Sequence, residues 1–211
     1  MNLRVDHMGL PPLPTELLST YFCLPKTERL HFSKYIRYRH LENPEERFLG
    51  FFRLLEKLCF QKETFLPEDK LIPLLERAKP LLIRYFADKK NVERVLGRMS
   101  GWNNSKLNTA ACITKFLKTL PADLRKRWIY DASHIHEICT LRNDLTHANA
   151  VEPDPHDIET KAKFIEVLLV TRLLIAVGVS VESAAAIAPR LPGHTLTEKP
   201  AEVRITTTDG A

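Results

Sequence analysis

Apolar side chains recur along most of this chain at the three- and four-residue spacing of amphipathic helices. The clearest run begins after Asn43, which can cap a helix, and Pro44, which suits a first turn. Its apolar members are Phe48, Phe51, Phe52, Leu55 and Leu58. We find no segment with the regular alternation of a half-buried strand, so the pattern predicts an all-α fold.

Prolines and glycines set the boundaries of the other expected helices. Pro67, Pro73 and Pro80 divide one stretch into short helices, and the two glycines within 97–105 predict a turn region. A long helix is expected to begin near Pro121 and to end with residues 141–147. The remaining helices are expected over 15–23, 26–41, 105–119 and 156–178.

These elements predict one helical bundle of five to seven helices over residues 15–188. Residues 1–14 end in Leu-Pro-Pro-Leu-Pro, a stiff, extended lead-in of the kind that joins domains. Residues 189–211 are polar and rich in threonine, so we expect a disordered tail. The most apolar segment is 164–181, where Glu166 and Arg172 favour a buried core helix over a membrane span.

Composition narrows the class of protein without deciding the function. The 211 residues, 44% of them hydrophobic, suffice for one sizeable core, and a net charge of +5 permits nucleic-acid binding without requiring it. The first residues lack the apolar core of a signal peptide, so we expect a cytoplasmic protein. In a reducing cytoplasm the cysteines, which form no CxxC pair, are expected to be small buried side chains: Cys23, Cys59, Cys112 and Cys139.

One short run, 141–147, combines residue type, spacing and context that suggest chemistry. Arg142 is followed by Asn143 and, five positions after the arginine, by His147. Arginine offers a permanent charge and a planar fork of donors to a phosphate, and an imidazole can take up or release a proton near neutral pH. The alternative is that Arg142 and His147 only cap the helix, because cations favour a helix C-terminus.

The spacing of this pair also predicts a second copy of the chain. At about 100° per residue, Arg142 and His147 lie about 140° apart and cannot meet side by side on one ideal helix. Either the helix ends between them, or two copies of the helix face each other and share their groups. The second arrangement makes a symmetric homodimer the expected assembly.

Several other residues are weaker candidates. Asp144 can pair with an arginine of the facing helix, and His136, on the same polar stripe, can touch a substrate. A run that interleaves basic and aromatic residues can track RNA phosphates through Lys34, Arg37 and Arg39. For each of these the alternative is an ordinary structural or solvated side chain.

No metal or cofactor site is expected. The chain has no glycine-rich phosphate loop, no GxSxG and no HExxH. His134, His136 and Cys139 have metal-capable atoms, but one helix cannot aim all three at one ion.

The run from Arg142 to His147 resembles the signature of the HEPN superfamily, in which arginine and a polar residue are followed by histidine after a short spacing. The order of elements is similar too, with an early helix carrying Leu54-Leu55-Glu56, a motif helix and an apolar final helix. Over residues 30–180 the chain resembles the HEPN domain of ApeA-like anti-phage proteins. The resemblance implies an all-α bundle.

The resemblance also implies a metal-independent endoribonuclease of a prokaryotic anti-phage, abortive-infection or toxin–antitoxin system. Arg142 would bind the phosphate, His147 would move the proton, and Asn143 would orient the phosphate or the facing imidazole. The resemblance also implies an acidic residue on the early helix that orients Arg142, for which Glu56 is the candidate; the alternative is that Glu56 is an ordinary exposed surface residue. The product implied is a 2′,3′-cyclic phosphate, and the implied partners are RNA, a second copy and an antitoxin or sensor chain.

Two alternatives stay open at this stage. One is a catalytically silent HEPN module that binds RNA or a partner and only senses or dimerises. The other is an unrelated helical scaffold in which the Arg142–His147 spacing arose by chance.

Overall fold

The computed structural model describes residues 16–61, 64–103, 108–147 and 153–200. Within these residues lie ten α-helices and no β-strand, which confirms the all-α class, with more helices than the five to seven expected. In chain order they are α1 (Glu16–Cys23), α2 (Lys26–Arg39), α3 (Pro44–Cys59), α4 (Glu68–Phe86), α5 (Lys89–Asn103), α6 (Thr109–Thr119), α7 (Ala122–Arg127), α8 (Ile135–Thr146), α9 (Pro155–Ala176) and α10 (Val181–Ile187).

The chain divides into two compact units, where one bundle over 15–188 was expected. The first unit comprises Met1–Cys59 and Ile113–Ala211, and the second comprises Phe60–Cys112. The lead-in 1–14 and residues 201–211 of the expected tail lie outside the described residues.

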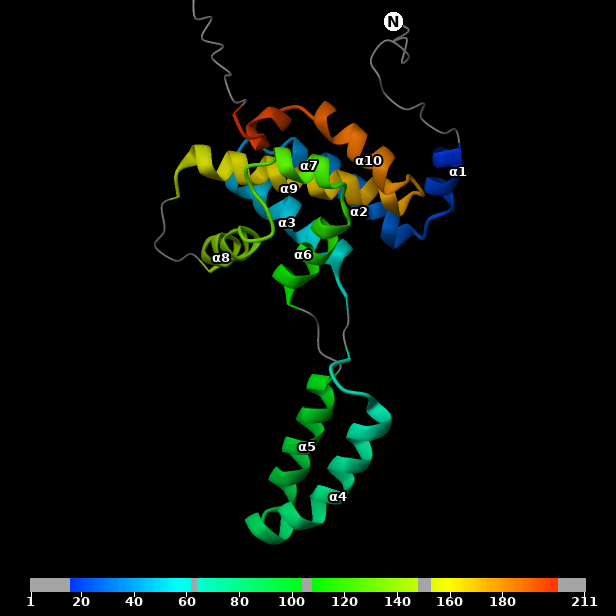
Figure 1. The fold of residues 1–211 in the computed structure, drawn as a ribbon, viewed down its shortest axis with the longest axis vertical. Helices are drawn as coiled ribbons and strands as arrows, with labels where there is room; N and C mark the ends of the chain where they lie inside the picture. The colour runs from blue at the N-terminus through cyan, green and yellow to red at the C-terminus, as the bar shows by residue number, and fades with distance from the viewer. Residues whose placement is uncertain (1–15, 62–63, 104–107, 148–152, 201–211) are drawn as a thin grey trace, which may run out of the picture. The chain divides into compact units, whose positions relative to one another are not determined.

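Helix α9 forms the centre of the first unit and packs along α3 (Figure 1). Six consecutive residues of α9, from Phe164 to Leu169, are buried, so the helix is enclosed on all sides. This confirms the expected buried core helix at the most apolar segment. No helix among the described residues is long and apolar enough to cross a membrane.

The start of α3 follows the local sequence signal. The Asn43 side-chain oxygen accepts hydrogen bonds from the backbone N–H groups of Glu45, at 2.8 Å, and Glu46, at 3.4 Å. These bonds satisfy two donors that a helix N-terminus would otherwise leave unpaired. The expected cap is therefore confirmed, and α3 then buries the phenylalanines Phe48, Phe51 and Phe52.

The long helix expected from Pro121 is instead two helices, α7 and α8, separated by residues 128–134. Trp128 at the break has an extended backbone, is fully buried, and packs edge-on against the Phe164 ring at a centroid distance of 5.5 Å. Burying an indole stabilises the fold by more than continuing one short helix does. The expectation was wrong here because helical periodicity does not report this long-range contact.

The expected disorder from residue 189 is wrong for residues 189–200. This segment forms two 3-10 helices, Ala188–Arg190 and His194–Thr197, and both His194 and Thr197 are buried. Its backbone pairs with the segment after α7, since Ile129 N–H donates to the Thr197 carbonyl at 2.8 Å. Polar composition suggested disorder, but these hydrogen bonds hold the segment against the core.

The second unit is a hairpin in which α4 and α5 run antiparallel, side by side (Figure 1). Pro73 and Pro80 lie inside α4, which was expected to be divided at each of them. Both prolines are exposed and seven residues apart, so the carbonyl groups that lose a donor face water. Helix α5 likewise continues through Gly97 and Gly101, where a turn region was expected.

Candidate functional site

The motif residues lie in the last turns of α8, which packs against α3 in the first unit. Ile138 and Leu141 are buried and orient the helix, while Arg142 on its flank is partly exposed. Asn143 and His147 are exposed. The helix therefore presents the polar end of its motif to solvent and keeps the arginine next to α3.

Arg142 is held in place by three neighbours. One guanidinium nitrogen donates to the Glu56 carboxylate of α3 at 2.6 Å, and another donates to the Asn143 side-chain oxygen at 2.9 Å. The guanidinium also lies over the Phe52 ring, 5.4 Å from its centroid. Within the described residues these hydrogen bonds use two of the five N–H donors of the group, so others can reach an anion.

His147 ends the helix. Its backbone is not helical, its N–H donates to the Asn143 carbonyl at 2.9 Å, and its imidazole is exposed. Helix α8 ends at Thr146, so the helix ends between Arg142 and His147, which was one of the two expected arrangements. The two side chains nevertheless point in different directions, Arg142 toward Glu56 on α3 and His147 into solvent.

The neighbouring thiol does not add a nucleophile to this group. Burial raises the pKa of Cys139 to about 11, and the nearby Glu56 carboxylate acts in the same direction while Arg142 opposes it. The thiol therefore stays neutral near neutral pH.

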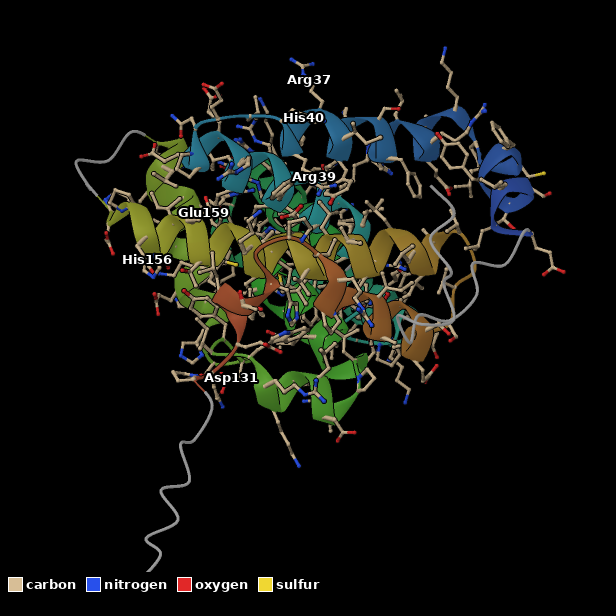
Figure 2. The ribbon with its side chains drawn as sticks, turned by 90° about the horizontal axis from the view of Figure 1, so that it is seen from above. Arg37, Arg39, His40, Asp131, His156 and Glu159 are labelled. Atoms are coloured by element: carbon tan, nitrogen blue, oxygen red, sulfur yellow. The ribbon has the colours of Figure 1, made fainter. Side chains whose placement is uncertain are left out.

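The remaining sequence candidates are distributed over two helices. His136 is exposed and Asp144 is half-buried, both on α8. Lys34 and Arg37 are exposed on α2, and Arg37 points outward in Figure 2, whereas Arg39 turns toward Glu166 of α9 at 3.8 Å. The contacts of the described residues thus bring Glu56 and Asn143 to Arg142 but do not join the basic residues of α2 to that group.

Sequence reasoning missed the ion pairs that orient α8. Lys161 of α9 is buried, and its amino group lies 2.7 Å from the Glu137 carboxylate of α8 and 2.6 Å from Asp157. The four-residue spacing of Asp157 and Lys161 was a signal for one of these pairs. The pairing of Lys161 with Glu137 joins two different helices, so no local spacing in the sequence indicates it.

The described residues contain no group of three or more histidine, cysteine or acidic side chains arranged to hold a metal ion. His134, which directly precedes α8, contacts the Asp131 carboxylate at 2.9 Å.

Comparison with known families agrees with the resemblance of the motif. The Apea-like HEPN family matches residues 49–183, well over half of the chain, and this segment contains Glu56, α8 and the core helix α9. Comparisons with curated proteins and with solved structures gave no match. The extent of the family match shows that this chain belongs to the Apea-like HEPN family.

Proposed function

We propose that this chain is a metal-independent endoribonuclease of a prokaryotic anti-phage, abortive-infection or toxin–antitoxin system. The observation that carries the proposal is the Arg142 guanidinium, fixed by Glu56 and Asn143 on the helix that ends at the exposed His147 imidazole. Membership of the Apea-like HEPN family, whose domains are nuclease-type modules of defence systems, supports it.

The chemistry needs two proton transfers and one stabilised charge. The RNA 2′-oxygen attacks the adjacent phosphorus and loses its proton to a base, while the bond from phosphorus to the 5′-oxygen breaks and that oxygen gains a proton from an acid. Imidazoles exchange protons near neutral pH and can fill either role. The remaining donors of Arg142 offset the negative charge that develops on the phosphorane oxygens. The products are a 2′,3′-cyclic phosphate and a free 5′-hydroxyl.

A single motif helix supplies only part of this set. The Arg142 guanidinium is turned toward Glu56 on α3, whereas the exposed His147 follows the last residue of α8. The motif of one chain also has one histidine for two proton transfers. A second copy facing the first would supply the other imidazole and bring an Arg142 opposite a His147. We therefore propose a composite site in a symmetric homodimer, with Asn143 orienting the phosphate or the facing imidazole.

The ion pair between Arg142 and Glu56 also fits a second function, that of a catalytically silent HEPN module. A carboxylate 2.6 Å from the guanidinium offsets much of its charge, which would suit a catalytically silent module that binds RNA weakly. The two functions differ in whether RNA is cut, so one assay separates them.

The test is incubation of the purified protein with total RNA in EDTA, followed by analysis of the RNA ends. We expect cleavage that leaves cyclic-phosphate ends with the wild-type protein, and a loss of at least about 100-fold with His147→Ala or Arg142→Ala. His156→Ala is the matched control, because it removes another exposed imidazole outside the motif. Full activity in His147→Ala would refute the proposed role, and RNA binding without cleavage by a folded wild-type dimer would identify the silent module.

A further inference from the structure

The α4–α5 hairpin exposes more apolar surface than two packed helices need to. Eight large hydrophobic side chains on these helices are between 44% and 83% exposed: Ile72, Leu74, Leu81, Tyr85, Phe86, Val95, Met99 and Trp102. Leu71, Leu75 and Leu82 of α4 are half-buried, while Val92 and Leu96 of α5 are buried. These last five account for the seam between the helices, so the exposed set requires a separate explanation.

Most of the exposed set lies on one face of the hairpin. On α4, Leu74, Leu81 and Tyr85 fall within about 40° of one another, and on α5 the residues Val95, Met99 and Trp102 fall within about 60°. With Ala78 added to the α4 group, the residues of each group are separated alternately by four and three positions, as in a heptad repeat. Because the helices are antiparallel, the two groups flank the seam on the same side. We call these six exposed residues the apolar face.

A cavity of about 410 Å³ lies between the two helices near the tip of the hairpin. Leu82 and Phe86 line it from α4 and Val92 and Val95 from α5, with Asp88 and Asn91 at the tip, so Val95 joins it to the apolar face. Large apolar side chains that are exposed singly are ordinary, but six that are gathered on one face of a hairpin, each at least 44% exposed, indicate an interaction surface.

The opposite side of the hairpin is polar. Lys79 of α4 and Glu93 of α5 form an ion pair there at 2.9 Å and line a second hollow of about 260 Å³ together with Glu76. By helical position Asp69 also belongs to this side. The acidic residues of the two helices are thus gathered away from the apolar face. Asp88 at the tip caps α5 through the Asn91 backbone N–H at 3.0 Å.

Basic residues border the apolar face on both helices. Lys70, Arg77 and Arg84 recur every seven residues along the outer edge of α4, and all three are exposed. Arg94 and Arg98 take the corresponding edge of α5, and both are exposed too. The face is therefore apolar along its centre and cationic along its two edges.

These observations choose between the possible occupants. A second copy of the same face would bring cationic edges against cationic edges, which is unfavourable. A lipid surface would match the charge but would not fill a hollow between two helices. A helix with an apolar row and acidic flanks fits both features, because its row can enter the hollow while its carboxylates meet the arginines. We propose that the apolar face of the α4–α5 hairpin binds an acidic amphipathic helix of a partner protein.

This inference goes beyond the proposed ribonuclease activity and does not depend on it, because every residue it uses lies in the second unit. The probe is a labelled 21-residue helical peptide with leucine at its heptad core positions and glutamate at its flanks, titrated against the full-length protein. Its twin carries lysine in place of each glutamate. We expect the acidic peptide to bind, with an affinity that falls as salt rises, and the lysine peptide to bind at least about tenfold more weakly.

Two variants test the face. Leu81→Glu should weaken the acidic peptide by about tenfold or more, whereas Ile72→Glu, an exposed apolar residue of α4 that lines the polar-side hollow, should keep wild-type affinity. Arg77→Glu with Arg84→Glu should reverse the preference toward the lysine peptide. Circular dichroism of each variant checks that α4 and α5 stay helical.

Several results would overturn the inference. The inference is wrong if the folded wild-type protein does not bind the acidic peptide, or if it binds the two peptides equally. It is also wrong if Leu81→Glu binds the acidic peptide as tightly as the wild-type protein does. Tighter binding to phosphatidylglycerol vesicles that Leu81→Glu abolishes would assign the face to a membrane surface. Self-association that the same substitution abolishes would assign it to a second copy.

Discussion

The Glu56 carboxylate fixes the Arg142 guanidinium from a position 86 residues earlier in the chain. The pair is partly solvated, with side chains 26% and 32% exposed, so its contribution to the free energy of unfolding is small, roughly 0–1 kcal/mol. Its geometric effect is larger, because a guanidinium bound at a carboxylate and over the Phe52 ring samples few orientations. Glu56 is therefore best described as a positioning residue.

We predict that Glu56→Ala lowers RNA cleavage by about tenfold or more, mainly through kcat, while the free energy of unfolding changes by less than about 1 kcal/mol. Glu56→Gln, which keeps a hydrogen-bond acceptor, should recover part of kcat. Glu159→Ala is the matched control, because it removes the carboxylate that pairs with Arg47 between α9 and α3, a pair of similar exposure away from the motif. Steady-state cleavage and urea unfolding measure both quantities. Equal losses of activity in the two alanine variants would contradict a specific role for Glu56.

At the scale of elements, α2 and α3 pack closely at Gly50. A Cβ atom built there would lie 2.6 Å from the Tyr38 ring, closer than side-chain contacts allow. Gly50 is buried in the middle of α3, where glycine otherwise costs helix stability. The residue is therefore explained by the packing of α2 on α3.

Gly50→Ala should lower the free energy of unfolding by about 1–3 kcal/mol, because the added methyl group forces Tyr38 to move. Gly97→Ala in α5 is the control, since a Cβ atom there meets nothing within 4 Å. That substitution should raise helix stability by about 0.5–1 kcal/mol. Urea or thermal unfolding checks both, and a stabilising Gly50→Ala would show that the helices can separate without cost.

At the scale of the whole first unit, the last described segment closes over Trp128. The Trp128 indole N–H donates to His194 Nε2 at 3.4 Å. For this bond Nε2 must carry no proton, so the imidazole must be neutral. Burial lowers the pKa of His194, and Arg127 acts in the same direction while Glu198 opposes it. Burial, with Lys57 and Lys34, also lowers the pKa of His31.

The sign of the resulting pH dependence follows from these directions. The unfolded chain binds protons at these histidines below about pH 6.5, whereas the folded protein does so only at lower pH. The contribution of these two histidines to the free energy of unfolding should thus be constant above that pH and fall as the pH drops toward their folded-state pKa values. His194→Gln, which keeps an acceptor for Trp128, should reduce the difference between about pH 7.5 and about pH 5.5 in urea unfolding. An unchanged difference, equal to that of the exposed-site control His156→Gln, would contradict this account.

The proposed dimer also makes a prediction at this scale. If the motifs of both copies share one site, a heterodimer of the wild-type chain with the double variant Arg142→Ala/His147→Ala lacks one imidazole and one guanidinium. After random exchange of an equal mixture, about a quarter of the dimers are fully wild type, so cleavage should fall to about a quarter of that of the same total amount of wild-type protein. Cleavage at about half, after exchange is shown by differential labelling, would mean that each chain acts alone.

The sequence by itself determined those features whose causes lie within a few residues. Helical periodicity predicted the all-α class and the core helix α9, and Asn43 predicted the start of α3, because capping and amphipathic burial are local effects. The order of Arg142, Asn143 and His147 identified the family resemblance for the same reason, since the motif is contiguous.

Tertiary structure decided the features whose causes are distant in sequence. Burial of Trp128 against Phe164 breaks the expected long helix, and pairing with Ile129 orders the segment that composition marked as disordered. The resemblance to HEPN proteins suggested Glu56, but its contact with Arg142 exists only because α3 packs on α8. These contacts stabilise the fold through long-range burial and hydrogen bonding, which local patterns of hydrophobic and polar residues do not encode.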